Sequence, residues 1–274
     1  MAVTMAEISK LRHLTGAGLM DCKKALAEAN NDMEAAIEII RKKGQSVAAK
    51  REDREAAEGC VLSASTGKFA AIVALKCETD FVAKNEGFVS LTKKILAGAM
   101  EKEAKSIDEV KALLIDGKSV ADLIVEEIGK TGETMELGAY EYIEAPSTIA
   151  YNHFGNKLAS IVGFNEEGVD AQVAKEVAMR VAAMNPIAVC REEVPAKIAE
   201  QELEIGREKA REEGKPEAII DRIAQGRLNK FYKENVLMEQ EFVSDNSMDI
   251  ATYLKKQSEG LKAISFRRVN LNED

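Results

Sequence analysis

The feature that most limits how this chain can fold is an abrupt change of pattern near residue 80. Residues 69–75 are all apolar, which predicts a well-buried strand. Residues 88–99 then place apolar side chains three or four positions apart, which predicts one face of a helix. The junction between them, 79–85, is polar apart from the ring of Phe81 and two small apolar residues. Such a junction is a rigid place to mount a short projecting loop.

Two interpretations of Phe81 follow from the residues alone. The ring could project from the loop. Alternatively, it could be a hydrophobic staple that packs back on the first helical turn, with Asp80 or Asn85 capping free N–H groups. Aromatic residues near helix starts usually serve the fold, so the residues alone favour the staple.

Composition narrows the class of protein. The chain has 274 residues, 46% of them hydrophobic and 31% charged, which is typical of a soluble globular protein. We expect no membrane association, because no segment approaches the roughly 18 to 20 apolar residues of a membrane span. The start, residues 1–10, lacks the features of a signal peptide, so we expect a cytoplasmic protein. The net charge of −9 argues against direct nucleic-acid binding and suits a basic patch on a protein partner.

Signals for catalysis or cofactor binding are weak. Gly117-Lys118-Ser119 and Gly129-Lys130-Thr131 imitate the end of a phosphate-binding loop but lack its first glycine, so we interpret both as ordinary helix ends or turns. The four cysteines are scattered and are expected to be reduced core residues. We therefore predict no catalytic residue, no cofactor and no metal site.

The two histidines are the only side chains that could act as acid or base near neutral pH. His13 is expected on a polar helix face. His153 lies at a predicted hairpin turn, where a hydrogen bond within the turn is the ordinary interpretation.

Residues 1–44 predict a domain of three short helices. Thr4-x-x-Glu7 is a capping-box pattern at the start of the first helix. A second helix fits 19–29, and Lys42-Lys43-Gly44 is expected to end the third. The side chains expected to face inward are Ile8, Leu11, Leu14, Ala36, Ile37 and Ile40.

The rest of the chain predicts an α+β fold. Residues 45–58 have few large apolar side chains and are interpreted as a helical or flexible linker. Residues 59–145 predict a first core lobe, with a hairpin, helices and a further strand. Residues 146–190 and 236–274 repeat the order of strand pair and helix, with 247–256 helical and 261–271 extended. We expect two similar lobes of antiparallel sheet and helix.

Residues 191–235 predict an insertion into the second lobe. Two charged, helix-rich segments, 195–213 and 217–234, meet at Gly214-Lys215-Pro216. Their apolar positions are sparse enough for a two-helix seam, which predicts an antiparallel coiled-coil hairpin. Such a hairpin could bind a partner, brace a dimer or be a solvated insertion.

Three ordered stretches together identify a family. Residues 11–26 contain Thr15-Gly16-Ala17-Gly18-Leu19-Met20-Asp21-Cys22-Lys23-Lys24-Ala25-Leu26, residues 31–37 follow, and residues 78–85 read Glu78-Thr79-Asp80-Phe81-Val82-Ala83-Lys84-Asn85. These stretches closely resemble the translation elongation factor Ts family, whose members are guanine-nucleotide exchange factors of elongation factor Tu. The order of the predicted elements fits this family from residue 1 to about 271.

The resemblance implies a fold and an activity. The family has an N-terminal three-helix domain similar to ubiquitin-associated (UBA-like) domains, a two-lobed core and a late coiled-coil hairpin. It implies binding to GDP-bound and nucleotide-free elongation factor Tu and promotion of GDP release, without covalent catalysis. It also allows a homodimer through the second lobe. The extra C-terminal helix that several bacterial members carry is not expected after residues 272–274.

The resemblance also implies site residues. The loop expected to push between two helices of the partner's GTPase domain, beside its magnesium ion, is Thr79, Asp80, Phe81, Val82 and Ala83. Phe81 would then be a wedge and not a staple. The further partner contacts are Arg12, Leu19 and Met20 in the N-terminal domain and His153 and Gly155 in the second lobe.

Two other functions stay open. A helical adaptor could use the N-terminal domain to recognise a different protein. An enzyme with a dispersed site would be supported by a metal or substrate-like ligand in purified protein.

Overall fold

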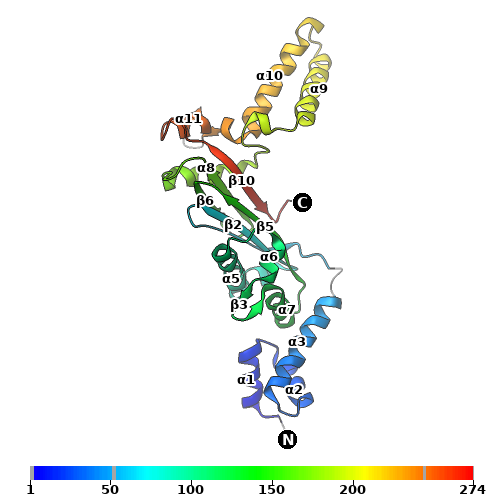
Figure 1. Ribbon diagram of the computed structural model, residues 1–274. Helices are drawn as coiled ribbons and strands as arrows, with labels where there is room; N and C mark the ends of the chain where they lie inside the picture. The colour runs from blue at the N-terminus through cyan, green and yellow to red at the C-terminus, as the bar shows by residue number, and fades with distance from the viewer. Residues whose placement is uncertain (1–2, 51–53, 243–244, 274) are drawn as a thin grey trace.

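The computed structural model describes residues 3–50, 54–242 and 245–273. The molecule is elongated: a helical module lies at one end, sheets and helices form the middle, and a pair of helices projects from the other end (Figure 1). The parts of the predicted domains that fall on 1–2, 51–53, 243–244 and 274 lie outside the described residues. Within the described part, no helix has an apolar stretch long enough to cross a bilayer.

The N-terminal module consists of α1 (Met5–Thr15), α2 (Leu19–Glu28) and α3 (Met33–Lys50). Both hydrogen bonds of the predicted capping box between Thr4 and Glu7 are present, and Gly16 ends α1 with a φ of 70°. The largest buried side chains of the module are Ile8, Leu11 and Leu26.

Two expectations for the module are wrong. Leu14 and Ile37 do not join its core: their exposed fractions are 57% and 37%. The third helix does not end at Gly44 but continues to Lys50, because Gly44 is buried against a helix of the core and keeps a helical backbone there.

The first core lobe is a three-stranded antiparallel sheet covered by helices. The sheet has the order β1-β2-β5. The elements are β1 (Glu58–Ser65), β2 (Phe69–Cys77), α4 (Asp80–Ala83), α5 (Glu86–Lys102), α6 (Ile107–Ala112), β3 (Leu114–Ile115), β4 (Lys118–Ser119), α7 (Val120–Thr131) and β5 (Met135–Glu144). The small β3–β4 hairpin was not predicted.

The second lobe repeats this plan, with a sheet of order β10-β7-β6. Its elements are β6 (Ser147–Asn152), β7 (Leu158–Phe164), α8 (Ala171–Met184), β8 (Glu241–Phe242), β9 (Asp245–Asp249), α11 (Ile250–Lys255) and β10 (Ala263–Asn270). The helix expected over 247–256 begins only at Ile250, because Asp249 belongs to β9 and caps the helix by accepting a hydrogen bond from Thr252 N–H at 2.7 Å.

The two sheets pack face to face and give four layers. Side chains of β2 alternate between a cluster shared with α5 and a cluster shared with the other sheet, so the strand is apolar on both faces. The layer between the sheets contains Val61, Ala70, Ile72, Ala74, Ile143, Ala159 and Ile161. Helix α8 covers the outer face of the second sheet. The combination of antiparallel sheets and separate helices confirms the α+β prediction.

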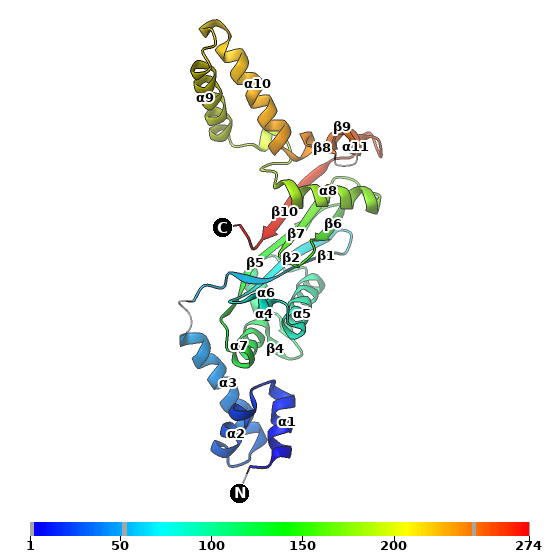
Figure 2. The same cartoon turned by 180° about the vertical axis from the view of Figure 1, so that it is seen from behind.

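The helical hairpin, α9 (Ala196–Glu212) and α10 (Glu217–Asn235), points away from the core (Figure 2). It is flanked by two short 3-10 helices, η1 (Arg191–Glu193) and η2 (Leu237–Glu239). Gly214, with a φ of 70°, forms the turn between the helices. The hairpin therefore exists as predicted, whereas its coiled-coil character, the UBA-like character of the module and the domain boundaries stay predictions.

Candidate functional site

The predicted loop forms α4, a helix of four residues between β2 and α5. Ala83 is buried, and Val82 packs against the core of the first lobe. Phe81, in contrast, has an exposed fraction of 84%, so the hydrophobic staple that the residues alone favoured is wrong. Asn85 caps α5 as expected, since its Oδ1 accepts a hydrogen bond from Gly87 N–H at 2.8 Å. The result is an aromatic ring that projects from a buried mount.

Thr79 holds the start of α4 in place. Its N–H and its hydroxyl donate hydrogen bonds to the Glu133 carboxylate, at 3.0 Å and 2.6 Å. The Cys77 thiol donates to Thr79 O at 3.3 Å, and burial raises the pKa of this thiol to about 12, so it keeps its proton at neutral pH. Three contacts thus fix the residue from which the loop departs.

Asp80 presents a negative charge beside the ring. Lys84 Nζ donates a hydrogen bond to Asp80 Oδ2 at 2.6 Å, and this bond holds the pKa of Asp80 below its usual value. The positive charge of Lys157, which itself pairs with Glu58 at 2.7 Å, lowers the pKa of Asp80 further. Asp80 therefore carries its charge at neutral pH.

A second aromatic ring projects from the β6–β7 turn. Phe154 has an exposed fraction of 97%, and Gly155 allows the turn with a φ of 88°. The His153 ring nitrogen Nδ1 lies 3.0 Å from the Tyr151 hydroxyl, so the histidine has a partner next to the turn. Val61 N–H of β1 donates to the Asn156 carbonyl at 2.7 Å, which ties the turn to the first lobe.

The β6–β7 turn and α4 both lie beside β1. Lys157, directly after the turn, is close enough to Asp80 to influence its pKa. His153 and Gly155 belong to this turn, whereas Asp80 and Phe81 belong to α4. Phe154 was not predicted, although the turn residues Gly155 and Asn156 directly after it were a signal for its exposure.

The other predicted contacts lie on the N-terminal module. Arg12, Leu19 and Met20 are all exposed, the last two in the first turn of α2. Met5 is exposed as well, on α1, and was not predicted. These residues are separate from the loop surface, so their spacing from it depends on how the module sits on the core.

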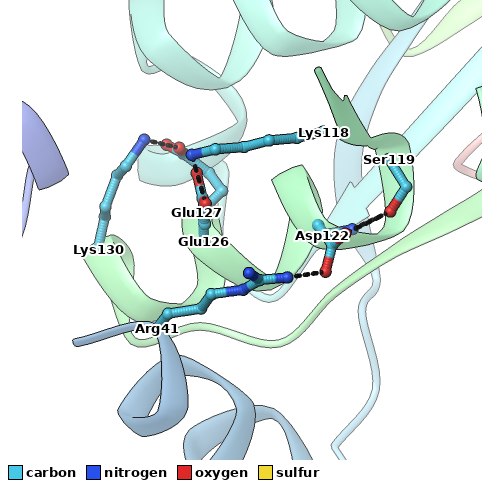
Figure 3. Close-up of polar contacts among 7 residues, drawn as sticks. All are labelled: Arg41, Lys118, Ser119, Asp122, Glu126, Glu127 and Lys130. Atoms are coloured by element: carbon cyan, nitrogen blue, oxygen red, sulfur yellow. Dashed lines mark hydrogen bonds and ion pairs between the residues drawn. The ribbon is translucent and has the colours of Figure 1, made fainter. Parts of the chain in front are cut away.

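Helix α3 of the module packs directly on α7 of the first lobe (Figure 3). At their closest approach, a Cβ added to Gly44 would lie 3.0 Å from the Val125 carbonyl oxygen, and one added to Gly129 would lie 3.2 Å from the Gly44 Cα. Beside this contact, Arg41 pairs with Asp122 at 2.7 Å. We call this contact the α3–α7 seat.

The start of α7 and the edge of the seat are polar. The Ser119 hydroxyl caps α7 and also donates a hydrogen bond to Asp122 Oδ2 at 2.8 Å (Figure 3). Next to the seat, a cavity of about 50 Å³ is lined in part by Leu14 and Ile37, the two side chains that the sequence analysis had assigned to the core of the module. Both side chains therefore line a cavity at the seat and do not belong to the core of the module.

In the residues that the structure describes, no group of three His, Cys, Asp or Glu side chains is placed to bind a metal ion. The described surface carries ion pairs of lysines and arginines with carboxylates, such as Lys84 with Asp80 and Arg41 with Asp122.

Similarity to known proteins shows the family of this chain. The family described as Elongation factor TS matches residues 78–273, which begin at the candidate loop. The chain is 59% identical to the Elongation factor Ts of Porphyromonas gingivalis, with 100% of both chains covered. It is 56% identical to that of Azobacteroides pseudotrichonymphae, over 99% of both chains, and 43% identical to that of Christiangramia forsetii, over 98% of both. The chain therefore belongs to the elongation factor Ts family, a family of translation elongation.

Proposed function

We propose that this protein is the guanine-nucleotide exchange factor of elongation factor Tu. It binds the GDP-bound and nucleotide-free forms of that partner in the cytoplasm and promotes GDP release without covalent chemistry. The observation that carries the proposal is the ring of Phe81, exposed to 84% on a loop whose neighbours are fixed in the core. An exposed aromatic side chain on a rigid mount suits a residue that becomes buried in a partner.

The mechanism is differential binding. Phe81 and Asp80 insert between two helices of the partner's GTPase domain, beside the bound magnesium ion. Burial of a Phe side chain contributes roughly 1.5–3 kcal/mol, or about 10- to 150-fold in an equilibrium. This free energy favours the partner conformation that holds magnesium and GDP weakly. Because coupling between two ligands is reciprocal, GTP binding in turn releases the exchange factor.

The remaining contacts provide affinity. Arg12, Leu19 and Met20 dock on the same GTPase domain, so the loop acts within a bound complex. His153 and Gly155 contact the region of the partner's phosphate-binding loop, and the exposed ring of Phe154 between them extends that surface. The acidic net charge of −9 suits a basic patch on the partner. A homodimer through the second lobe is a separate prediction, which sedimentation would test.

The test is stopped-flow release of fluorescent GDP from elongation factor Tu. We expect strong acceleration by the wild type and loss of most of it in Phe81→Ala and Asp80→Ala. Leu114→Ala is the matched control, since Leu114 has an exposed fraction of 73% on the β3–β4 hairpin, away from the loop. A wild type that does not accelerate release would exclude exchange activity. Binding that is independent of the nucleotide would favour the helical adaptor instead.

A further inference from the structure

We propose that Glu133 is a positioning residue that sets the direction in which Phe81 projects. The part of this inference that concerns the exchange rate depends on the proposed function, whereas the part that concerns the loop does not. Glu133 lies just after α7 and far from the loop in sequence, and its carboxylate contacts Thr79 at the start of the loop.

The geometry is that of a two-point brace. Glu133 Oε2 accepts the Thr79 N–H at 3.0 Å and Oε1 accepts the Thr79 hydroxyl at 2.6 Å. A further hydrogen bond joins the same two segments in the opposite direction, since Thr134 N–H donates to Glu78 Oε1 at 2.7 Å. Hydrogen bonds to a carboxylate are among the stronger ones in proteins, and two of them on one residue fix orientation as well as position.

The brace also determines how α4 begins. The Thr79 hydroxyl gives its only proton to Glu133, so a lone pair remains to accept the Val82 N–H at 3.4 Å, as the N-cap of α4. A helix of four residues has almost no stability of its own. Its backbone therefore depends on this cap at one end and on the packing of Val82 and Ala83 against the first lobe at the other.

Phe81 has little else to fix its direction. With 84% of the side chain exposed, packing contributes little, and the backbone of α4 decides where the ring points. Gly132 ends α7 in the left-handed conformation, and its N–H donates a hydrogen bond to the Ile128 carbonyl at 2.8 Å. This cap fixes the position of the backbone at Glu133, the next residue. The same helix carries the α3–α7 seat, so α7 supports both surfaces that are proposed to contact the partner.

The first test needs no partner. The chain contains no tryptophan, so Phe81→Trp introduces a single fluorescent reporter on the loop. We expect its steady-state anisotropy to fall when Glu133→Ala is added, because α4 loses its oriented cap. The matched control is Glu136→Ala, which removes a carboxylate three residues further on, where it pairs with Lys76 at 3.6 Å and not with the loop. Equal anisotropy in the two variants would overturn the inference.

The second test is a double-mutant cycle on GDP release. We expect Glu133→Ala to reduce the acceleration about tenfold, the loss typical of a charged hydrogen bond, and Glu133→Gln to lie between it and the wild type. In a Phe81→Ala background, Glu133→Ala should have little further effect, because it acts through the ring. Additive effects would overturn the positioning role.

The outcomes separate the two proposals. If wild type fails to accelerate release, the proposed function is wrong, and the anisotropy still decides whether Glu133 positions the loop. If wild type and Phe81→Ala behave as proposed but Glu133→Ala equals Glu136→Ala, only the inference is wrong. Thr79→Val, which removes the hydroxyl from the other side of the brace, gives the same readouts if Glu133→Ala does not fold.

Discussion

The N-terminal module and the helical hairpin project from opposite ends of the same core and are attached to it in different ways (Figure 1). The module has a small core of its own, and α3 lies along α7. The hairpin has few buried side chains and is connected at its base, where Arg191 pairs with Glu239 and lies 4.7 Å from the Tyr232 ring centre. The module therefore contacts the core along a helix, whereas the hairpin contacts it at its base.

Glycine has a different use in each arm. Gly44 in α3 of the module and Gly129 in α7 of the core let these two helices approach closely. In the hairpin, Gly206 lets α9 approach α10, since an added Cβ would lie 3.0 Å from the Ala224 Cα. Close approach therefore fixes the module relative to the core, whereas in the hairpin it fixes only the two helices relative to each other. We infer that the orientation of the module relative to the core is more rigidly fixed than the orientation of the hairpin.

The largest expected effect is that of Gly129→Leu. The new side chain would meet the α3 backbone, which cannot move aside as a flexible side chain can, and overpacking of this kind costs about 1–3 kcal/mol. We expect the module to leave α7. The acceleration of GDP release should then fall about tenfold, because the two partner contacts would no longer be held at a fixed distance from each other.

Small-angle X-ray scattering and stopped-flow GDP release measure this prediction. The control is Gly226→Leu on α10, where an added Cβ has no heavy atom within 4 Å and where the gain in helix propensity is the same. An unchanged scattering profile for Gly129→Leu would mean that the α3–α7 seat does not hold the module.

Gly206→Leu should separate the two helices of the hairpin without disturbing the module. Ala224 is buried under Gly206, so a larger side chain at 206 forces the helices apart, again at a cost of about 1–3 kcal/mol. We expect a loss of helical circular dichroism and a change in GDP release of less than about twofold, as for changes remote from a contact surface. A loss as large as that of Gly129→Leu would show that the hairpin contributes to exchange and would remove the contrast between the arms.

The sequence predicted most of the elements on which this comparison depends. The strand β2 was recognisable because it is buried on both faces and is therefore apolar throughout. The helix α8 was recognisable because its apolar residues share one face. The end of α3 was predicted wrongly. Lys42-Lys43-Gly44 is a local signal for the end of a helix, but the contact of Gly44 with α7 overrides it. The β3–β4 hairpin was missed because its strands of two residues carry no periodicity, and β8, also of two residues, was missed for the same reason.

The candidate site was predictable only in part. The residues alone favoured a buried Phe81, and the resemblance to a family reversed this. Glu133 could not be found from the sequence, since its contact with Thr79 joins two segments 54 residues apart and no local pattern marks it. The α3–α7 seat was hidden for the same reason: Gly129 belongs to a motif that suggested only a helix end.

The polar contact beside the α3–α7 seat should matter less than its glycines. Arg41 and Asp122 are 49% and 38% exposed, and ion pairs at that exposure contribute about 0.2–1 kcal/mol. We expect Arg41→Ala to reduce exchange at most a few-fold. Arg207→Ala on the hairpin is the matched control, since Arg207 pairs with Asp221 at 2.7 Å and should affect only the hairpin. An effect of Arg41→Ala as large as that of Gly129→Leu would mean that charge, not packing, holds the module.

The smallest expected effect is the dependence of the seat on pH. The Ser119 hydrogen bond first, and then Arg41, hold the pKa of Asp122 below its ordinary value of 3.8. A carboxyl with a depressed folded pKa stabilises above its unfolded pKa and loses this contribution as pH falls through the folded pKa. The seat should thus be constant between about pH 5 and 8, where Asp122 is ionised in both states, and weaken only below pH 3.8. Scattering profiles across this range test the prediction, with Gly226→Leu as reference. A module that leaves α7 between pH 5 and 7 would require a titrating group other than Asp122 at the seat.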